Sequence, residues 1–390
     1  MLDTYTTGGV SRISPEAPVP VLHVEDVEHL PGGAGNVALN LVSLGARVSL
    51  LSRIGPDIEG KQLVSFLTEK GVDTSQMYVE RSYTTPVKNR LIGSGQQIVR
   101  LDRERLVPLS ELAEEEMVRS IDINAFDIVA ISDYGKGVMT KTLTSRLISL
   151  ARDAGIPVVV DPKGDDFTKY AKATLIKPNA KEARLAAPVS ELAALDRIGE
   201  ALLAQTKADM ILITRSQEGV SLFCSDGRRI DSPVKVREIL DVTGAGDTVL
   251  AVVTLALAAS LELPDMLALS NIAAGIAIEH IGCYRVTLTD LATRLLDLHA
   301  ESKIFDETHL VALKHALTDR PYTLLTLTPP FSQDLYGALC RAKQPNAALI
   351  VYTPETDPKF LELLASLSEV DFVVTSEQAL DILKEPLETR

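Results

Sequence analysis

A glycine-rich turn that leads directly into an apolar helical stretch constrains this chain more than any other feature. Residues 241–247 read Asp-Val-Thr-Gly-Ala-Gly-Asp, and the apolar stretch Thr248–Ser260 follows without a break. Small residues let the backbone turn tightly, and a helix N-terminus presents free amide groups and a positive dipole end to an anion. The junction therefore predicts an anion-binding turn with a carboxylate, Asp247, beside it.

This combination suits the transfer of a phosphoryl group to a hydroxyl. The amides of Gly244, Ala245 and Gly246 would stabilise charge on the phosphoryl oxygens, and Asp247 would accept the proton of the attacking hydroxyl. The alternative is an ordinary strand-to-helix turn in which the aspartate caps the helix. The two aspartates that bracket the glycines, Asp241 and Asp247, favour the catalytic interpretation.

Composition excludes several classes of protein. The 390 residues suffice for two or three domains, and 46% hydrophobic residues suffice for packed cores. A net charge of −14 argues against a nucleic-acid binder with a broad basic surface. No apolar run is long enough for a membrane span, and no signal peptide opens the chain. The three cysteines lack metal-site spacing and predict reduced thiols in a cytoplasmic protein.

Short apolar strands alternate with helical patterns over the first 300 residues. This alternation is typical of an α/β fold in which helices cover both faces of a parallel sheet. The predicted strands are Val48–Ser52, Ile128–Ser132, Val158–Asp161, Thr174–Lys177 and Met210–Thr214, and the predicted helices include Asn36–Leu44, Lys61–Glu69, Lys141–Ala154 and Leu192–Thr206.

Polar residues follow several of these strands, where ligands of such sheets bind. Asp133, Lys163, Asn179 and Arg215 each come just after a predicted strand. Asn179 and Glu182, three residues apart, could hold a hydrated Mg²⁺, although a capping box is the preferred interpretation from sequence alone.

Further motifs offer ligand contacts. Gly32-Gly33-Ala34-Gly35-Asn36 precedes a helix and allows close backbone approach to a ligand, or is simply a tight turn. Thr214 and Arg215 could contact nucleotide phosphates. A scatter of basic side chains suggests an anionic substrate, although each alone fits a solvated surface charge. These basic residues are Lys88, Arg90, Arg100, Lys136 and Lys163.

Two segments interrupt the alternation, and a third region follows it. Pro18–Val24 and Pro86–Leu101 could pair into a small lid sheet that excludes water, or form a surface hairpin. A break near residues 300–306 divides the chain into 1–300 and 301–390. The second part predicts a small three-stranded α/β unit. Its elements are helix Glu307–Leu317, strand Thr323–Thr328, helix Gln333–Ala342, strand Ala348–Tyr352, helix Pro358–Leu367, strand Val370–Val374 and helix Glu377–Leu383.

Together these motifs resemble the ribokinase (PfkB) family of sugar kinases over about residues 1–300. Residues 241–247 resemble that family's C-terminal signature, and 32–36 its N-terminal glycine signature. Longer strings resemble the D-glycero-β-D-manno-heptose-7-phosphate kinases, the kinase half of bifunctional kinase/adenylyltransferases of lipopolysaccharide core synthesis. These strings are residues 11–20, Gln96-Gln97 with Arg100-Leu-Asp102, Ser132-Asp-Tyr-Gly-Lys136 and Asp161-Pro-Lys-Gly164.

The resemblance implies a three-layer α/β sandwich with a small β lid, ATP and Mg²⁺ as cofactors, and a homodimer formed through the lid. It implies phosphorylation of the sugar phosphate at O1 to the 1,7-bisphosphate, with Asp247 as general base. It places the nucleotide near Asn179, Lys181, Glu182, Thr214, Arg215, Gly219, Asp241 and Asn271, with Asn179 and Glu182 at the metal. It places the sugar near Asp3, Gly32, Gly33, Asn36 and Asp133, with the basic residues named above as candidates for the 7-phosphate.

Two departures from the family pattern matter. The family has a strand before the position of Met1; without it we expect a gap in the sheet and a poorly held Asp3. Residues 301–390 resemble a Rossmann-like nucleotidyltransferase, but Pro329-Pro-Phe-Ser stands where its His-x-Gly-His motif would be, so adenylyl transfer is not expected. The alternatives to heptose phosphorylation are a kinase for another sugar or sugar phosphate, and a catalytically impaired regulatory relative.

Overall fold

The computed structural model describes residues 1–234, 239–280, 282–299, 303–305, 313–315, 317, 321–354 and 357–376. The chain divides into two compact units, Met1–Val286 and Thr287–Arg390. The sequence placed the division near residue 300, whereas helix α9 (Leu288–His299) falls in the second unit. Within the described residues, no helix is long and apolar enough to cross a membrane.

The main sheet of the first unit has the strand order β12-β11-β10-β9-β8-β7. Strands β7 to β10 run parallel, as predicted, and β11 and β12, which were not predicted, add an antiparallel hairpin at one edge. The hairpin at Gly219 explains the reversal, because its φ of 85° is one that glycine adopts readily. The strands are β7 (Val129–Ser132), β8 (Val158–Asp161), β9 (Leu175–Ile176), β10 (Met210–Thr214), β11 (Val220–Cys224) and β12 (Arg229–Ser232).

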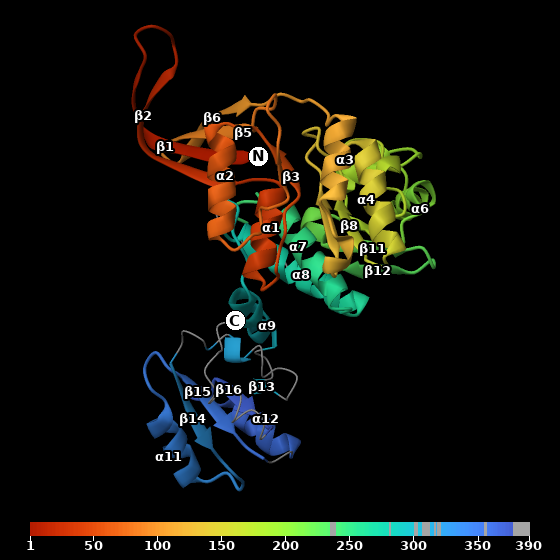
Figure 1. Cartoon of the computed structure of the whole chain (residues 1–390). Helices are drawn as coiled ribbons and strands as arrows, with labels where there is room; N and C mark the ends of the chain where they lie inside the picture. Colours follow the sequence, from red (N-terminus) through yellow and green to blue (C-terminus); the bar gives the residue numbers. More distant parts are fainter. Residues whose placement is uncertain are drawn as a thin grey trace. The chain divides into compact units, whose positions relative to one another are not determined.

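Helices cover both faces of this sheet, which gives the three predicted layers. Helices α1, α7 and α8 contact one face of the sheet, and α4, α5 and α6 contact the other face. Helix α3 packs on α4 (Figure 1). Val158, Val159 and Val160 of β8 are all almost fully buried, as a central strand between two helical layers requires. The helices are α1 (Ala34–Ser43), α2 (Ile58–Glu69), α3 (Glu111–Arg119), α4 (Lys141–Asp153), α5 (Ala180–Ala186), α6 (Leu195–Thr206), α7 (Ala245–Ala258) and α8 (Leu263–Ile278).

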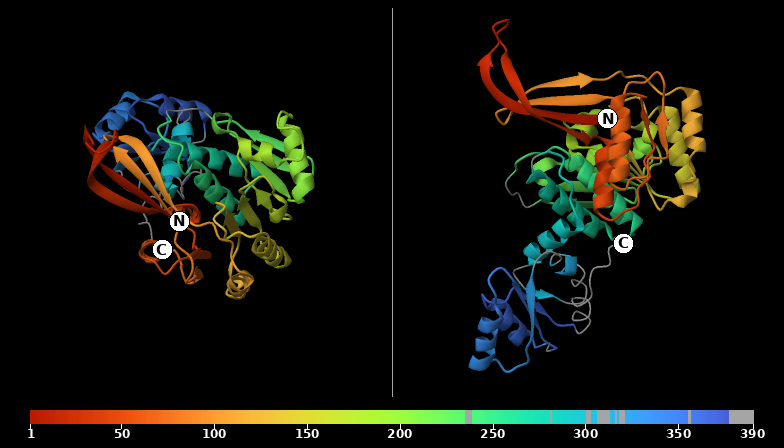
Figure 2. Two further views of the ribbon diagram at one scale, coloured as in Figure 1. Left: turned by 90° about the horizontal axis from the view of Figure 1, so that it is seen from above. Right: turned by 60° about the vertical axis from the view of Figure 1, so that its left-hand side comes forward.

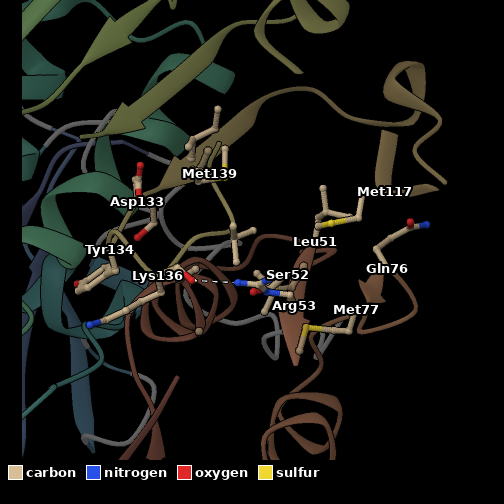
Figure 3. Close-up of a pocket in the computed structure, with 18 of the residues that line it drawn as sticks. Leu51, Ser52, Arg53, Gln76, Met77, Met117, Asp133, Tyr134, Lys136 and Met139 are labelled. Carbon is tan, nitrogen blue, oxygen red and sulfur yellow. Dashed lines mark hydrogen bonds between the residues drawn. The ribbon is translucent and has the colours of Figure 1, made fainter. Parts of the chain in front are cut away.

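A gap separates the main sheet from a smaller parallel pair, β3 (Ser52–Ile54) and β4 (Met77–Val79). A cavity of about 230 Å³ lies between β3 and β7, and no strand of the described residues fills it. Figure 3 shows Leu51 and Met117 on one side of the cavity and Met139 and Asp133 on another. The β3–β4 pair and the main sheet are thus two separate sheets; the strand that the family resemblance places before Met1 stays a prediction. The predicted strand Val48–Ser52 begins later, at Ser52, and Ser49 makes only an isolated bridge to Asp73.

The predicted lid is present and larger than expected. Its strand order is β2-β1-β5-β6, and Figures 1 and 2 show the β1–β2 hairpin reaching beyond the helices of the first unit. The long strand β1 was missed, because its many Thr and Gly residues give no apolar alternation. The strands are β1 (Leu2–Ile13), β2 (Pro20–Pro31), β5 (Val87–Gly93) and β6 (Gln96–Arg103).

The second unit contains the parallel sheet β13-β16-β15-β14. Strand β13 (Ile304–Phe305) adds to the three predicted strands, so the expectation of a three-stranded unit was wrong; two residues are too few for a sequence signal. The other elements are β14 (Tyr322–Thr326), α11 (Gln333–Ala342), β15 (Ala348–Tyr352), α12 (Pro358–Ser366) and β16 (Phe372–Val374). The predicted helices Glu307–Leu317 and Glu377–Leu383 lie largely or wholly outside the described residues.

Candidate active site

Asp247 lies in the first turn of α7 and is 5% exposed. Asn36 Nδ2 donates to its Oδ2 over 2.8 Å, and the Tyr134 hydroxyl donates to its Oδ1 over 2.8 Å. Burial raises the pKa of Asp247 to about 6, against the opposing effect of these two hydrogen bonds. A carboxylate with a pKa this close to neutrality is well suited to accept a proton from a substrate.

The glycine-rich turn before α7 is fixed by its own aspartate. Asp241 Oδ1 accepts hydrogen bonds from the amide of Thr243 over 2.9 Å and its hydroxyl over 2.7 Å, and Oδ2 accepts from the Gly282 amide over 2.9 Å. Gly244 has a φ of 81°, a conformation that favours glycine. The turn therefore presents the first amides of α7 at a helix N-terminus, next to Asp247. In the structure Asp241 shapes this turn, whereas the sequence placed it at the nucleotide.

A buried ion pair lies beside the turn. Lys177 Nζ is 3.1 Å from Asp161 Oδ2, and Lys177 is 3% exposed. A Cβ atom built on Gly246 would lie 3.8 Å from this ammonium group, so a positive charge sits close to the anion-binding amides. Lys177 was not among the predicted site residues, although a lysine at the carboxyl end of an otherwise apolar strand was the available signal.

Asp3 and Gly32 meet at the lid side of the site. Asp3 is 6% exposed, and its Oδ1 accepts a 2.8 Å ion-paired hydrogen bond from Arg90 of β5. A Cβ on Gly32 would lie 1.9 Å from Asp3 Oδ2, so only glycine fits there. The expectation that Asp3 would be poorly held was wrong, because β1 pairs along its length with β2 and β5 and carries Asp3 within this sheet.

The structure brings some of the predicted basic residues together and separates others. Lys88 lies near Lys136 and Asp3, and burial, followed by the charge of Lys136, lowers the pKa of Lys88. Lys136 is paired with Glu104, and the exposed Arg100 with Asp102. Lys163 pairs with Glu182 over 3.0 Å, on the nucleotide side of the predicted site. Lys88, Arg90 and Lys136 therefore form the basic group next to Asp3.

Asp133 is engaged by the protein itself. Its carboxylate accepts hydrogen bonds from Lys169 Nζ over 2.6 Å, the Tyr170 hydroxyl over 2.7 Å and the Gly135 amide over 2.7 Å. With these partners Asp133 fixes the loop 133–137, which follows β7 and carries Tyr134. Tyr134 was not among the predicted site residues, yet its hydroxyl contacts Asp247 directly; its position beside Asp133 after a strand was the signal.

The predicted nucleotide residues follow β9 and β10. Asn179 and Glu182 form the capping box of α5, and Asn179 bridges to Thr214. Arg215 is held by Glu218 over 3.0 Å, in the hairpin that ends at Gly219.

The other two predicted nucleotide residues lie on helices. Asn271 of α8 donates to the carbonyl and hydroxyl oxygens of Ser232 over 2.8 Å, and Lys181 of α5 is exposed. Among the described residues, no group of three or more His, Cys, Asp or Glu side chains could hold a metal ion directly. Because Mg²⁺ takes oxygen ligands and keeps several of its waters, Asn179 and Glu182 fit a position outside the water shell of a hydrated ion.

The comparisons with known proteins agree with this geometry. The model of the pfkB family carbohydrate kinases matches residues 5–290. Bifunctional protein HldE of Geobacter metallireducens is 47% identical over 306 residues, which is 77% of this chain and 62% of the relative, and that of Trichlorobacter lovleyi is 44% identical over the same shares. The chain thus spans about three fifths of the length of these relatives.

Solved structures show the same fold. Phosphofructokinase-2 from Escherichia coli in complex with potassium aligns with a TM-score of 0.63 at 22% identity, over 76% of this chain and 96% of that one. Arabidopsis thaliana ribokinase, complexed with ribose and ATP, aligns with a TM-score of 0.58 at 18% identity, over 75% and 94%. With a family match over most of its length and a ribokinase-like fold, the chain belongs to the pfkB family of carbohydrate kinases.

Proposed function

We propose that the chain transfers the γ-phosphoryl group of ATP to O1 of D-glycero-β-D-manno-heptose 7-phosphate. The observation that carries this proposal is the buried Asp247, with a pKa of about 6, at the helix N-terminus behind Gly244–Gly246. The identity of 40–47% to the HldE proteins over 295–325 residues supports the choice of sugar. The intact base and turn favour a working enzyme over a regulatory relative.

The proposed reaction follows from the geometry. The O1 hydroxyl of the sugar gives its proton to Asp247, its oxygen forms a bond to the γ-phosphorus, and the bond from that phosphorus to the ADP oxygen breaks. The amides at the start of α7 and the ammonium group of Lys177 stabilise the charge on the phosphoryl oxygens. Asp3, Gly32 and Gly33 would hold the sugar, and Lys88, Arg90 and Lys136 would face its 7-phosphate.

Residues after β9 and β10 would hold the nucleotide and its metal. Asn179 and Glu182 would bind a hydrated Mg²⁺, which supplies charge neutralisation on the phosphates. Lys181, Thr214 and Arg215 would contact the phosphates of ATP, and Asn271 would lie near its adenine ring. To bind the ion, Glu182 would have to release its capping contact and its pairing with Lys163.

The direct test measures ADP release by the full chain with ATP, Mg²⁺ and heptose 7-phosphate. We expect turnover with the wild type and a loss of at least about a thousandfold with Asp247→Asn, which removes the base but keeps the shape of the side chain. Fructose 6-phosphate and ribose serve as competing acceptors. Preference for one of these would replace heptose 7-phosphate as the substrate, and ATP binding without any turnover would support the regulatory alternative.

We also propose that two copies associate through the lid. Apolar side chains stand exposed on its strands: Ile13 is 61% exposed, Val24 57% and Leu101 52%. An exposed apolar sheet of this kind usually finds a partner. Sedimentation should show a dimer for the wild type and a monomer for Val24→Glu; a monomeric wild type would contradict the proposal.

The second unit lacks the histidines of a nucleotidyltransferase motif. The loop after β14 carries Pro329 and Pro330, and no histidine follows His315 in the sequence. Nucleotidyl transfer at this position would need imidazole groups on the triphosphate, so we propose that this unit has no adenylyltransferase activity.

A further inference from the structure

The hydroxyl of Tyr134 is hydrogen-bonded to one carboxylate oxygen of the proposed base, Asp247. It donates to Asp247 Oδ1 over 2.8 Å, while Asn36 donates to Oδ2 over 2.8 Å. An ionised carboxylate offers two lone pairs on each oxygen. Each oxygen of Asp247 therefore keeps one lone pair for an incoming hydroxyl, and the two donors fix the plane of the carboxylate.

The surroundings of Tyr134 hold its ring in one place. A Cβ built on Gly33, whose φ is 59°, would lie 3.1 Å from Tyr134 Cδ2, so the ring packs against the backbone of the glycine-rich turn before α1. The next residue, Gly135, donates its amide to Asp133 over 2.7 Å, and Asp133 is itself held by Lys169 and Tyr170. Figure 3 shows Tyr134 at the same end of the cavity as Asp133 and Lys136.

Several elements contribute groups that act on the pKa of Asp247. Asn36 of α1 is neutral, Asp161 at the end of β8 raises the pKa of Asp247, and Lys177 after β9 lowers it. Cys283, after α8, stays neutral because burial and the charges of Asp247 and Asp3 raise the pKa of its thiol to about 11. Burial and the charge of Asp247 likewise raise the pKa of Tyr134 far above its usual value, so the phenol remains a donor.

We propose that Tyr134 is a positioning residue for Asp247. The hydroxyl of Tyr134 keeps the buried carboxylate ionised and turned so that a free lone pair meets the acceptor hydroxyl. This inference rests on the proposed function of Asp247 as the base. It assigns to the loop after β7 a part in catalysis that does not require contact with sugar or nucleotide.

The first test is the pH profile of kcat for Tyr134→Phe, which keeps the ring on Gly33 and removes only the donor. Loss of one hydrogen bond to a charge should move the acid limb up by about one pH unit. Activity should then fall about fivefold at pH 6 and less than twofold at pH 8.5. An equal loss at every pH, or a change in KM alone, would show a merely structural role and overturn the proposal.

Tyr336→Phe is the matched control, because the Tyr336 hydroxyl also donates to a carboxylate, Glu369 Oε1 over 2.9 Å, in the second unit. We expect the wild-type profile for this variant. A shift of the acid limb in both variants would overturn the assignment to Tyr134.

The second test needs no substrate. In protein labelled with ¹³C at the aspartate carboxyl groups, the signal absent from Asp247→Asn identifies Asp247. Its titration midpoint should rise by about one unit in Tyr134→Phe and stay unchanged in Tyr336→Phe. An unchanged midpoint in Tyr134→Phe overturns the proposal even if the chain proves to use another acceptor, whereas turnover by Asp247→Asn would overturn the proposed function instead.

Discussion

Replacing Gly32 by alanine should disrupt the sugar side of the site. The new Cβ would lie 1.9 Å from Asp3 Oδ2 and 2.8 Å from Asp3 Cγ, whereas real Cβ contacts stay beyond 3.0 Å. The carboxylate must therefore retreat by about 1 Å, which breaks its 2.8 Å bond to Arg90. Because both side chains are mostly buried, losing this charged hydrogen bond costs about 1.5–3 kcal/mol.

Two measurements report this loss. If Asp3 binds the sugar, the KM for the sugar phosphate should rise about 10- to 100-fold with kcat less affected. The unfolding temperature of the first unit should fall by roughly 5 °C. Gly9→Ala is the control, because a Cβ there meets only the flexible end of Glu25, at 3.3 Å. Wild-type KM and stability in the Gly32→Ala protein would show that the Asp3–Arg90 pair survives the added Cβ atom.

Three further predictions follow from single contacts. The kcat/KM of the wild type should decline below a pH of about 6, because Asp247 must be ionised to accept a proton; a flat profile down to pH 5 would argue against this base. Lys177→Met should lower the free energy of unfolding in urea by about 3 kcal/mol, since it leaves the partly buried Asp161 without its partner, and adding Asp161→Asn should restore part of it; no loss would mean that the pair does not form in solution. Asp57 caps α2 and accepts hydrogen bonds from Gly60 and Thr85, and these bonds outweigh burial and lower the pKa of Asp57. The difference in free energy of unfolding between the wild type and Asp57→Asn should therefore be full above about pH 4 and shrink at lower pH. A difference that stays constant with pH would contradict the lowered pKa.

Local sequence signals predicted the parts of the fold that depend on short-range pattern. The apolar runs of β8 and β10 gave their bounds without error, and α11 and β15 were likewise placed at their observed ends. The edge hairpin β11–β12 was missed, because β12 has only four residues, Arg229–Ser232, and its charged side chains give no apolar run.

Long-range contacts explain what the sequence did not reveal about the site. Tyr134 was not predicted and lies 113 residues from Asp247; Asn36 was predicted at the sugar and lies 211 residues away, and no spacing rule links either of them to Asp247. Lys177 was passed over for the same reason, since its partner Asp161 belongs to the neighbouring strand. By contrast, Asp247 and its turn were identified because the whole motif lies within seven consecutive residues.

Whether Asp247 serves O1 phosphorylation of a sugar phosphate can be read from ³¹P NMR of the reaction mixture. With ATP, Mg²⁺ and heptose 7-phosphate, we expect a new phosphorus signal coupled to the anomeric proton beside an unchanged 7-phosphate signal, and no new signal with Asp247→Asn. A new signal of equal size with the Asp247→Asn protein, or none from a folded wild type that binds ATP, would rule out this role of Asp247.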